Sequence, residues 1–282
     1  MSEPCDSTSI LEVIRPARHT VPLVFASPHS GSAYPDEFVQ GSNLDPLSLR
    51  RSEDSFVDQL FAAAHGRGAP LLRALFPRAF CDPNREPYEL DPAMFEDDLP
   101  AFANTRSPRV AAGLGTIARV VANGAEISSR INGYYKPYHA ALRALVDETR
   151  DAFGFCVLVD CHSMPSVGGP MDKDPGEARV DFVLGDCFGT ACAPMIADTA
   201  ERCLTGLGYV VTRNDPYAGG FTTRHYGRPA DRVHALQIEI NRALYMNEET
   251  IRPSAYMPTL AGNLGQLIDA LGRLTGRELV PR

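Results

Sequence analysis

Two histidines stand at positions where a sheet-based protein usually carries its chemistry. His29 lies in a tight turn directly after the apolar run 22–26, and His162 comes directly after the run 155–160 and Cys161. Ligands of open α/β sheets bind beyond the carboxyl ends of the strands. Two imidazoles from separate strand ends, joined by one carboxylate, form the ligand set of a catalytic zinc ion with an open position for water. A histidine in a turn can also be a hydrogen-bonded structural residue, which is the alternative for each of them.

The third ligand is expected between the two histidines in the sequence. Glu53 and Asp54 are adjacent carboxylates at the start of a predicted helix, and either could reach the metal. A carboxylate in the first turn of a helix also interacts favourably with the helix dipole. That structural role is expected for whichever of the two is not a ligand.

Glu239 is a carboxylate inside an otherwise apolar strand, ALQIEI. Burying such a group is costly unless it is paired or takes part in a reaction. We therefore expect Glu239 to be a general base with a tuned pKa. The alternative is an ion pair with Arg242 or another arginine. Asp160, two residues before His162, could orient an imidazole, or it could equally cap the end of its strand.

Two further segments carry arginines suited to binding a substrate. Asn84 and Arg85 lie side by side in a loop bounded by prolines, and such a pair can grip a carboxylate. The glycine-rich segment 214–228 carries several Tyr and Arg side chains, and a loop of this kind can close over a polar ligand. Ordinary solvated charges are the alternative for its arginines, Arg224 and Arg228.

The elements that must position these residues follow an α/β pattern. Buried, β-branched runs alternate with helix-like stretches, which predicts a largely parallel sheet covered by helices on both faces. Strands are expected at 22–26, 69–75, 155–160, 180–184, 209–212 and 235–240. Helices are expected at 54–65, 138–153, 190–207 and 260–274.

The chain is expected to form one domain over residues 1–282, with a core at about 20–275. It contains no repeat of 20 to 50 residues and no low-complexity linker. The region 82–130 is rich in Pro, Asp, Arg and Asn, so we expect long loops and short helices packed over one edge of the sheet.

Composition excludes several classes of protein. The net charge of −8 argues against binding nucleic acid through a basic face. No apolar run approaches the roughly 20 residues that a membrane-spanning helix needs. The amino end is acidic, unlike a signal peptide, and the seven scattered cysteines form no disulfide framework. We expect a cytoplasmic protein that does not bind membranes.

Six motifs, in order along the chain, resemble one known family. They are SPHSG, RSEDSFVDQL, DPNREPYELDP, VDCHSM, NDPYAGGFTTRHYGRP and LQIEINRALYM. From about residue 22 to 246 the chain resembles the N-formylglutamate amidohydrolases, a branch of the zinc carboxypeptidase-like hydrolases that includes aspartoacylase. The resemblance implies a single-domain phosphorylase/hydrolase-like α/β fold, with a mixed, mostly parallel sheet and helices on both faces.

The resemblance also implies a role for each site residue. One Zn²⁺ per chain would be held by His29, His162 and a carboxylate, for which the family's acidic residue matches Asp54. Zinc carboxypeptidases take their carboxylate three residues after the first histidine, but this sequence has Ser32 there. Glu239 matches the general base. Asn84 and Arg85 match the pair that grips a substrate carboxylate, with Tyr226 as a further contact, and Arg224 or Arg228 is expected to stabilise the oxyanion.

The implied reaction is the hydrolysis of a small acidic N-acyl amino acid, N-formyl-L-glutamate, to formate and glutamate, within histidine catabolism. One alternative is a hydrolase of the same chemistry that acts on another N-acyl amino acid or a peptide, because loop residues set the substrate. The other is a catalytically idle ligand-binding homologue. The residues leave the oligomeric state open.

Overall fold

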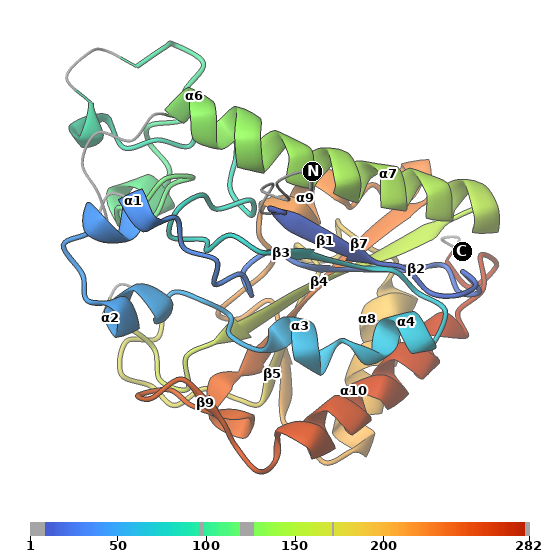
Figure 1. Ribbon diagram of the computed structural model, residues 1–282. Coiled ribbons are helices and arrows are strands. Elements are labelled where there is room, and N and C mark those ends of the chain that lie inside the picture. Colours follow the sequence, from blue (N-terminus) through green and yellow to red (C-terminus); the bar gives the residue numbers. More distant parts are fainter. Residues whose placement is uncertain (1–8, 96–98, 119–126, 171, 280–282) are drawn as a thin grey trace, which may run out of the picture.

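One sheet runs through the middle of the molecule (Figure 1). The computed structural model describes residues 9–95, 99–118, 127–170 and 172–279. Within these ranges seven strands form the sheet in the order β1-β3-β2-β4-β7-β5-β6. Their bounds are β1 Leu11–Ile14, β2 Leu23–Ser27, β3 Leu71–Ala74, β4 Cys156–Met164, β5 Phe182–Gly185, β6 Val211–Arg213 and β7 Val233–Asn241, and the short strands β8 Met246–Asn247 and β9 Arg252–Pro253 pair separately.

The sheet is mixed and mostly parallel. The four adjacent strands β3, β2, β4 and β7 are parallel to one another, whereas β1 is antiparallel to β3 at one edge. On the other side, β5 is antiparallel to β7 and parallel to β6. The carboxyl ends of β2, β3, β4 and β7 therefore meet at one edge of the sheet, where ligands of α/β proteins bind.

The two central strands extend beyond their predicted ends. Every residue of β4 pairs with a residue of β7, from Cys156 opposite Val233 to Met164 opposite Asn241. His162 therefore lies inside β4, whereas the sequence analysis expected it just after the strand. Pairing with β7 continues past the purely apolar part of β4 because ladder hydrogen bonds do not depend on side-chain polarity.

Helices cover both faces of the sheet, as Figure 1 shows. The long helix α7 packs on β2, β3 and β4, while α3 packs on the other face with α8 and α10. These faces correspond to two separate hydrophobic clusters. The helix bounds are α1 Asp36–Gln40, α2 Pro46–Arg50, α3 Val57–Leu60, α4 Ala63–Gly66, α5 Pro108–Ala111, α6 Ile127–Arg130, α7 Lys136–Phe153, α8 Pro194–Gly206, α9 Phe221–Tyr226 and α10 Met257–Gly272, with short turns η1 Pro92–Met94, η2 Ile131–Tyr135, η3 Pro229–Asp231 and η4 Arg242–Leu244.

The predicted fold class is confirmed, and the differences are local. The helix expected at 54–65 is broken into α3 and α4, and it begins late because Phe56 has a left-handed backbone with φ of 69°. Strand β1 was not predicted. Loops, η1, α5 and α6 occupy the described part of 82–130, while 96–98 and 119–126 lie outside the described residues.

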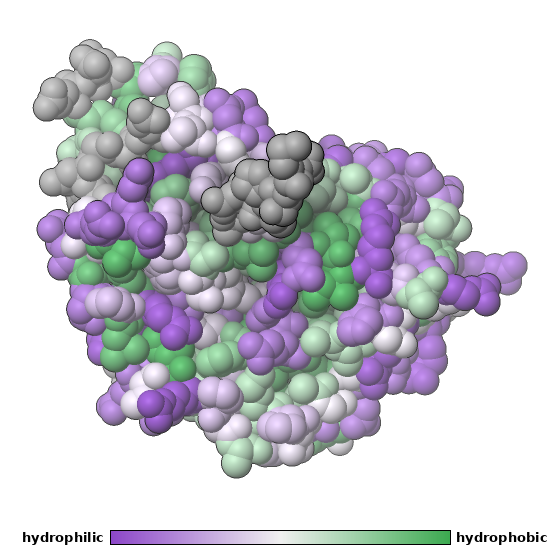
Figure 2. All heavy atoms as spheres, in the orientation of Figure 1, coloured by the Kyte–Doolittle hydropathy of each residue, from purple (hydrophilic) through white to green (hydrophobic). Residues whose placement is uncertain are grey.

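The face drawn in Figure 2 is a mixture of hydrophilic side chains and small apolar areas. None of the described helices is both long enough and apolar enough to cross a membrane.

Candidate metal centre and substrate cavity

Three different elements bring His29, Asp54 and His162 together. His29 follows the end of β2, Asp54 lies in the turn before α3, and His162 is inside β4. The amide of Asp54 donates to the carbonyl of His29 at 3.0 Å, which ties the first two loops to each other. All three side chains are buried.

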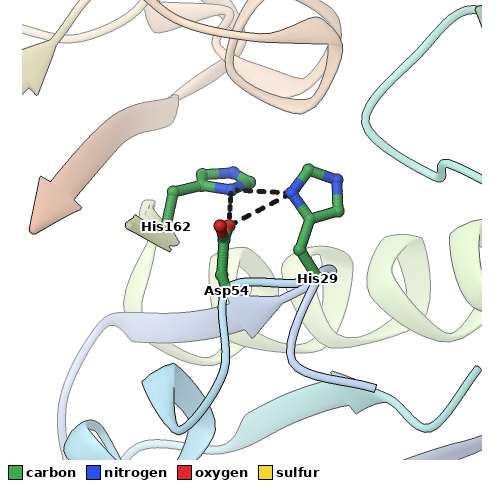
Figure 3. A group of neighbouring side chains, drawn as sticks. All are labelled: His29, Asp54 and His162. Atoms are coloured by element: carbon green, nitrogen blue, oxygen red, sulfur yellow. Dashed lines mark hydrogen bonds and ion pairs between the residues drawn. The ribbon is translucent and has the colours of Figure 1, made fainter. Parts of the chain in front are cut away.

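The ligand atoms of these residues point at one another (Figure 3). His29 Nδ1 and His162 Nδ1 are 3.2 Å apart, and Asp54 Oδ2 lies 3.2 Å from the first and 3.1 Å from the second. Two ring nitrogens and a carboxylate oxygen that converge in this way form a group that could hold a metal ion.

The far side of each ring shows that the donor set suits a cation. His29 Nε2 lies 2.7 Å from Asp82 Oδ1, and His162 Nε2 lies 3.0 Å from Asp160 Oδ1. The Asp82 carboxylate accepts a hydrogen bond and so favours the His29 ring proton on Nε2, which would leave Nδ1 of His29 to bind a metal. A carboxylate on the far ring nitrogen is typical of histidine ligands. Asp160 Oδ1 lies at a similar distance from His162 but has no hydrogen-bond partner among the described residues.

The second oxygen of Asp54 is held by the protein. Asp54 Oδ1 accepts hydrogen bonds from Arg242 Nη2 at 3.0 Å and from Ser163 Oγ at 3.2 Å. Burial raises the pKa of Asp54, but the hydrogen bonds to His162 and His29 and the Arg242 charge outweigh this effect, so its pKa lies well below the usual range. Asp54 is therefore ionised and held in place, with Oδ2 directed at the two ring nitrogens.

Asp82 is a functional candidate that the sequence analysis did not assign a role. It accepts from Arg78 Nη2 at 2.7 Å while it holds His29. Burial raises its pKa, but Arg78 and His29 lower it well below the usual value, so Asp82 is ionised. Its position two residues before Asn84, in the loop after β3, was the only available signal.

Glu239 lies directly beside His162. The two are Cα partners on the parallel strands β7 and β4, so their side chains leave the same face of the sheet. Burial raises the pKa of Glu239 to about 7, because the lowering effect of the His162 charge is outweighed by burial and by the like charge of Asp54. Its Oε1 accepts from Gln237 Nε2 at 2.9 Å. Arg242, the ion-pair partner considered from the sequence, binds Asp54 instead.

Glu53 is directed away from the metal centre. It binds Arg50 at 3.1 Å, Tyr34 at 2.8 Å and Ser55 at 2.7 Å. These contacts belong to a separate cavity of about 420 Å³, whereas Asp54 lines the cavity that contains both histidines.

The metal centre opens into a cavity of about 660 Å³. Glu239, Asn84 and Arg85 line it together with the two histidines. Asn84 Oδ1 accepts from the Thr222 amide at 2.8 Å, and its Nδ2 lies 3.1 Å from His162 Nε2. Arg85 donates to the carbonyls of Leu114 and Asn84. Burial lowers the pKa of Arg85 to about 10, which still leaves it cationic at neutral pH.

Three predicted site residues are not brought to this cavity. Arg224 and Arg228 are exposed; the first donates to the Gly219 carbonyl at 3.1 Å, and the second lies 3.4 Å from Asp231. Tyr226 is buried in the core, where its hydroxyl lies 2.9 Å from His139 Nδ1. The glycine-rich segment 214–228, which was expected to be a loop that closes over a ligand, is partly helical. It contains the helix α9, whose outer face carries Arg224. Tyr217, from the same segment, does line the cavity.

Comparison with known proteins places this arrangement in a family. The model of the N-formylglutamate amidohydrolase family matches residues 21–246. The chain belongs to the N-formylglutamate amidohydrolase family. It is thus an amidohydrolase, an enzyme that hydrolyses an amide bond, as predicted.

Relatives of known identity match most of the chain. An N-formylglutamate deformylase from Pseudomonas putida is 31% identical over 89% of this chain and 92% of its own length. A second, from Pseudomonas aeruginosa, is 28% identical over 89% of this chain and 91% of its own length. The crystal structure of an N-formylglutamate amidohydrolase from Ralstonia eutropha is 37% identical, has a TM-score of 0.85, and covers 95% of this chain and 98% of that one.

Proposed function

We propose that this amidohydrolase uses a zinc ion to hydrolyse N-formyl-L-glutamate to formate and L-glutamate. The observation that carries the proposal is the buried group of His29, Asp54 and His162, which adjoins Glu239 in a cavity rich in arginine. The names of the Pseudomonas deformylases support the substrate. A place in histidine catabolism and a cytoplasmic location are part of the same proposal.

The choice of zinc rests on the donor set. Two imidazole nitrogens and one carboxylate oxygen are typical of catalytic zinc sites, which keep one position free. When bound, zinc supplies a Lewis acid that makes water a usable nucleophile at neutral pH. The chain's own contribution is to hold the far ring nitrogen of His29 with Asp82, to place Asp160 beside the far ring nitrogen of His162, and to keep Asp54 ionised through Arg242.

Glu239 is proposed to move the proton. Gln237 occupies Oε1, which leaves Oε2 to accept a proton from the attacking water and to return it to the leaving nitrogen. A pKa of about 7 suits both steps, because the group is close to half protonated at neutral pH. This raised pKa is a consequence of burial in the strand that the sequence analysis singled out.

Arg78 takes the oxyanion role that was expected of Arg224 or Arg228. Two observations support this: Arg78 lines the cavity, and its charge acts on both Asp54 and Glu239. One of its nitrogens binds Asp82, so the guanidinium has further N–H groups to offer. A fixed cation at this position would stabilise the negative charge that develops on the carbonyl oxygen.

Arg85 is proposed to hold one substrate carboxylate, and Asn84 shapes the site beside it. Arg85 uses Nε and Nη1 for backbone carbonyls, and its Nη2 is 3.7 Å from Asp82. A buried guanidinium with this remaining donor capacity is suited to an anionic ligand.

The test is to measure metal content together with formate release from N-formyl-L-glutamate, before and after chelation. We expect close to one zinc per chain and release that stops on chelation and returns with added zinc. If zinc is bound but no formate is released, the proposal of a zinc-dependent hydrolase is retained and N-formyl-L-glutamate is rejected as its substrate. Another N-acyl amino acid or a peptide would then be the substrate. Neither metal nor activity, even after adding zinc, would favour an idle binding protein.

A further inference from the structure

The charges that line the substrate cavity do not balance. Among the described residues, the cavity-lining cations other than histidine are Arg51, Arg78, Arg85, Arg109, Lys173 and Arg242. Arg78 is paired with Asp82 at 2.7 Å, and Arg242 with Asp54 at 3.0 Å. The cavity therefore has more positive charge than its own carboxylates neutralise, so it favours a ligand with more than one negative charge.

Arg109 is an exposed side chain that lines the same cavity as the buried Arg85. Within the described part of the chain, its guanidinium has no hydrogen-bond acceptor and no ion-pair partner. Its charge acts on two groups across the cavity. Burial is the main cause that lowers the pKa of Arg85, and Arg109 lowers it further; burial raises the pKa of Tyr217 to about 12, and Arg109 opposes that rise.

The position of Arg109 is fixed relative to Arg85 by the backbone. The carbonyl of Arg109 accepts from the amide of Leu114 at 2.8 Å, and the carbonyl of Leu114 accepts from Arg85 Nε at 3.1 Å. The helix α5 that carries Arg109 is anchored at its start by Ser107, whose hydroxyl binds both the Val110 amide and the buried Glu89. The backbone of Arg109 and the guanidinium of Arg85 thus belong to one hydrogen-bonded unit.

We propose that Arg109 binds the side-chain carboxylate of the substrate, while Arg85 binds its α-carboxylate. This inference rests on the proposed function and adds the residue that selects an acidic side chain. Two cations with similar charge stay close together at little cost only when anions lie between them. A dicarboxylate supplies one carboxylate for each guanidinium, whereas the amide of a neutral side chain leaves Arg109 without an anion.

The first test compares N-formyl-L-glutamate with N-formyl-L-glutamine, which has nearly the same shape but no side-chain charge. In the zinc-loaded enzyme, Arg109→Ala should lower kcat/KM for the glutamate substrate by about 10- to 100-fold, the factor expected for a lost charge-assisted hydrogen bond. It should change the value for the glutamine substrate by less than twofold. Arg109→Lys should recover part of the loss, because it keeps the charge but not the two-pronged geometry.

Lys173→Ala is the matched control, since Lys173 is also an exposed cation that lines the cavity. We expect it to change the preference for glutamate over glutamine by less than twofold. Equal losses on both substrates in Arg109→Ala, or a larger loss of preference in Lys173→Ala, would overturn the assignment.

A binding measurement separates this inference from the proposed reaction. Calorimetry on the metal-depleted protein can compare glutarate, which has two carboxylates, with butyrate, which has one. Glutarate should bind at least tenfold more tightly, and Arg109→Ala should remove that advantage. If the wild type releases no formate but prefers glutarate, the proposed reaction is wrong and the carboxylate-binding role of Arg109 is retained. If the preference for glutarate survives in Arg109→Ala, that role is rejected.

Discussion

Glu239 and His162 are direct register partners on the parallel strands β7 and β4. This relationship places the proposed base beside a proposed metal ligand without any loop between them. The relative position of the two side chains is therefore set by the ladder of the two longest strands, which is more rigid than a loop.

Replacing the proposed base should separate metal binding from catalysis. Glu239→Gln keeps the shape of the side chain but cannot accept the proton, so kcat should fall by at least about 100-fold. Zinc content should stay at the wild-type value, because Glu239 is not in the ligand group. Metal analysis and formate release on the same sample check both points, and full activity in this variant would remove Glu239 from the mechanism.

The raised pKa of Glu239 also predicts a stability that depends on pH. In the metal-free protein its pKa is about 7, above the ordinary value of 4.5 that applies when the chain is unfolded. The folded state therefore binds a proton more tightly, and this contribution is complete below about pH 4.5 and lost as the pH rises through 7. Relative to Glu239→Gln, wild type should lose about 3 kcal/mol of unfolding free energy across this window. Denaturant unfolding of both proteins at several pH values measures this loss. If the unfolding free energies of wild type and Glu239→Gln changed in parallel with pH, the raised pKa of Glu239 would be rejected.

Glu53 and Asp54 are adjacent carboxylates, and we expect replacement by the corresponding amide to have a different effect at each of them. Asp54→Asn should lose most bound zinc, because Asp54 Oδ2 is one of the three converging ligand atoms. Glu53→Gln should keep zinc but lower the free energy of unfolding by about 1 kcal/mol, because the buried Glu53 loses its charged contact with the partly exposed Arg50. Metal content and denaturant unfolding of both variants test this. Loss of zinc in Glu53→Gln alone would reverse the ligand assignment.

Arg242 should act through Asp54. Arg242→Gln removes the charged donor to Asp54 Oδ1 and should weaken zinc affinity by about 10- to 100-fold. The rate at saturating zinc should fall much less than in Glu239→Gln. Competition with a chelator gives the affinity, and Arg150→Gln, which changes an arginine with surface ion pairs, is the control. Unchanged affinity in Arg242→Gln would show that Asp54 needs no such support.

The sequence was informative where chemistry coincides with the ends of buried strands. His29, His162 and Glu239 could be found because a polar residue in or after an apolar strand is unusual, and the fold class followed from the same runs. The choice of Asp54 over Glu53 came from the resemblance, because adjacent carboxylates have no distinguishing pattern.

The remaining site residues depend on contacts between distant segments. Arg224 was expected at the site because its segment is rich in glycine, but the short helix α9 turns it outward. Asp82 lies in a loop and Arg109 in the four-residue helix α5, and neither segment is long enough to show hydrophobic periodicity. Only their surroundings, His29 and the cavity shared with Arg85, indicate what they do.

The three proposed ligands are far apart along the chain. Asp54 is 25 residues from His29 and 108 residues from His162. A fragment that ends before β4 would contain two ligands and no complete site, so tight zinc binding requires the β2–β4 pairing that forms the centre of the sheet. An ion that binds only the assembled chain stabilises it in proportion to the logarithm of its concentration. Zinc supply would therefore control the lifetime of the folded enzyme as well as its activity.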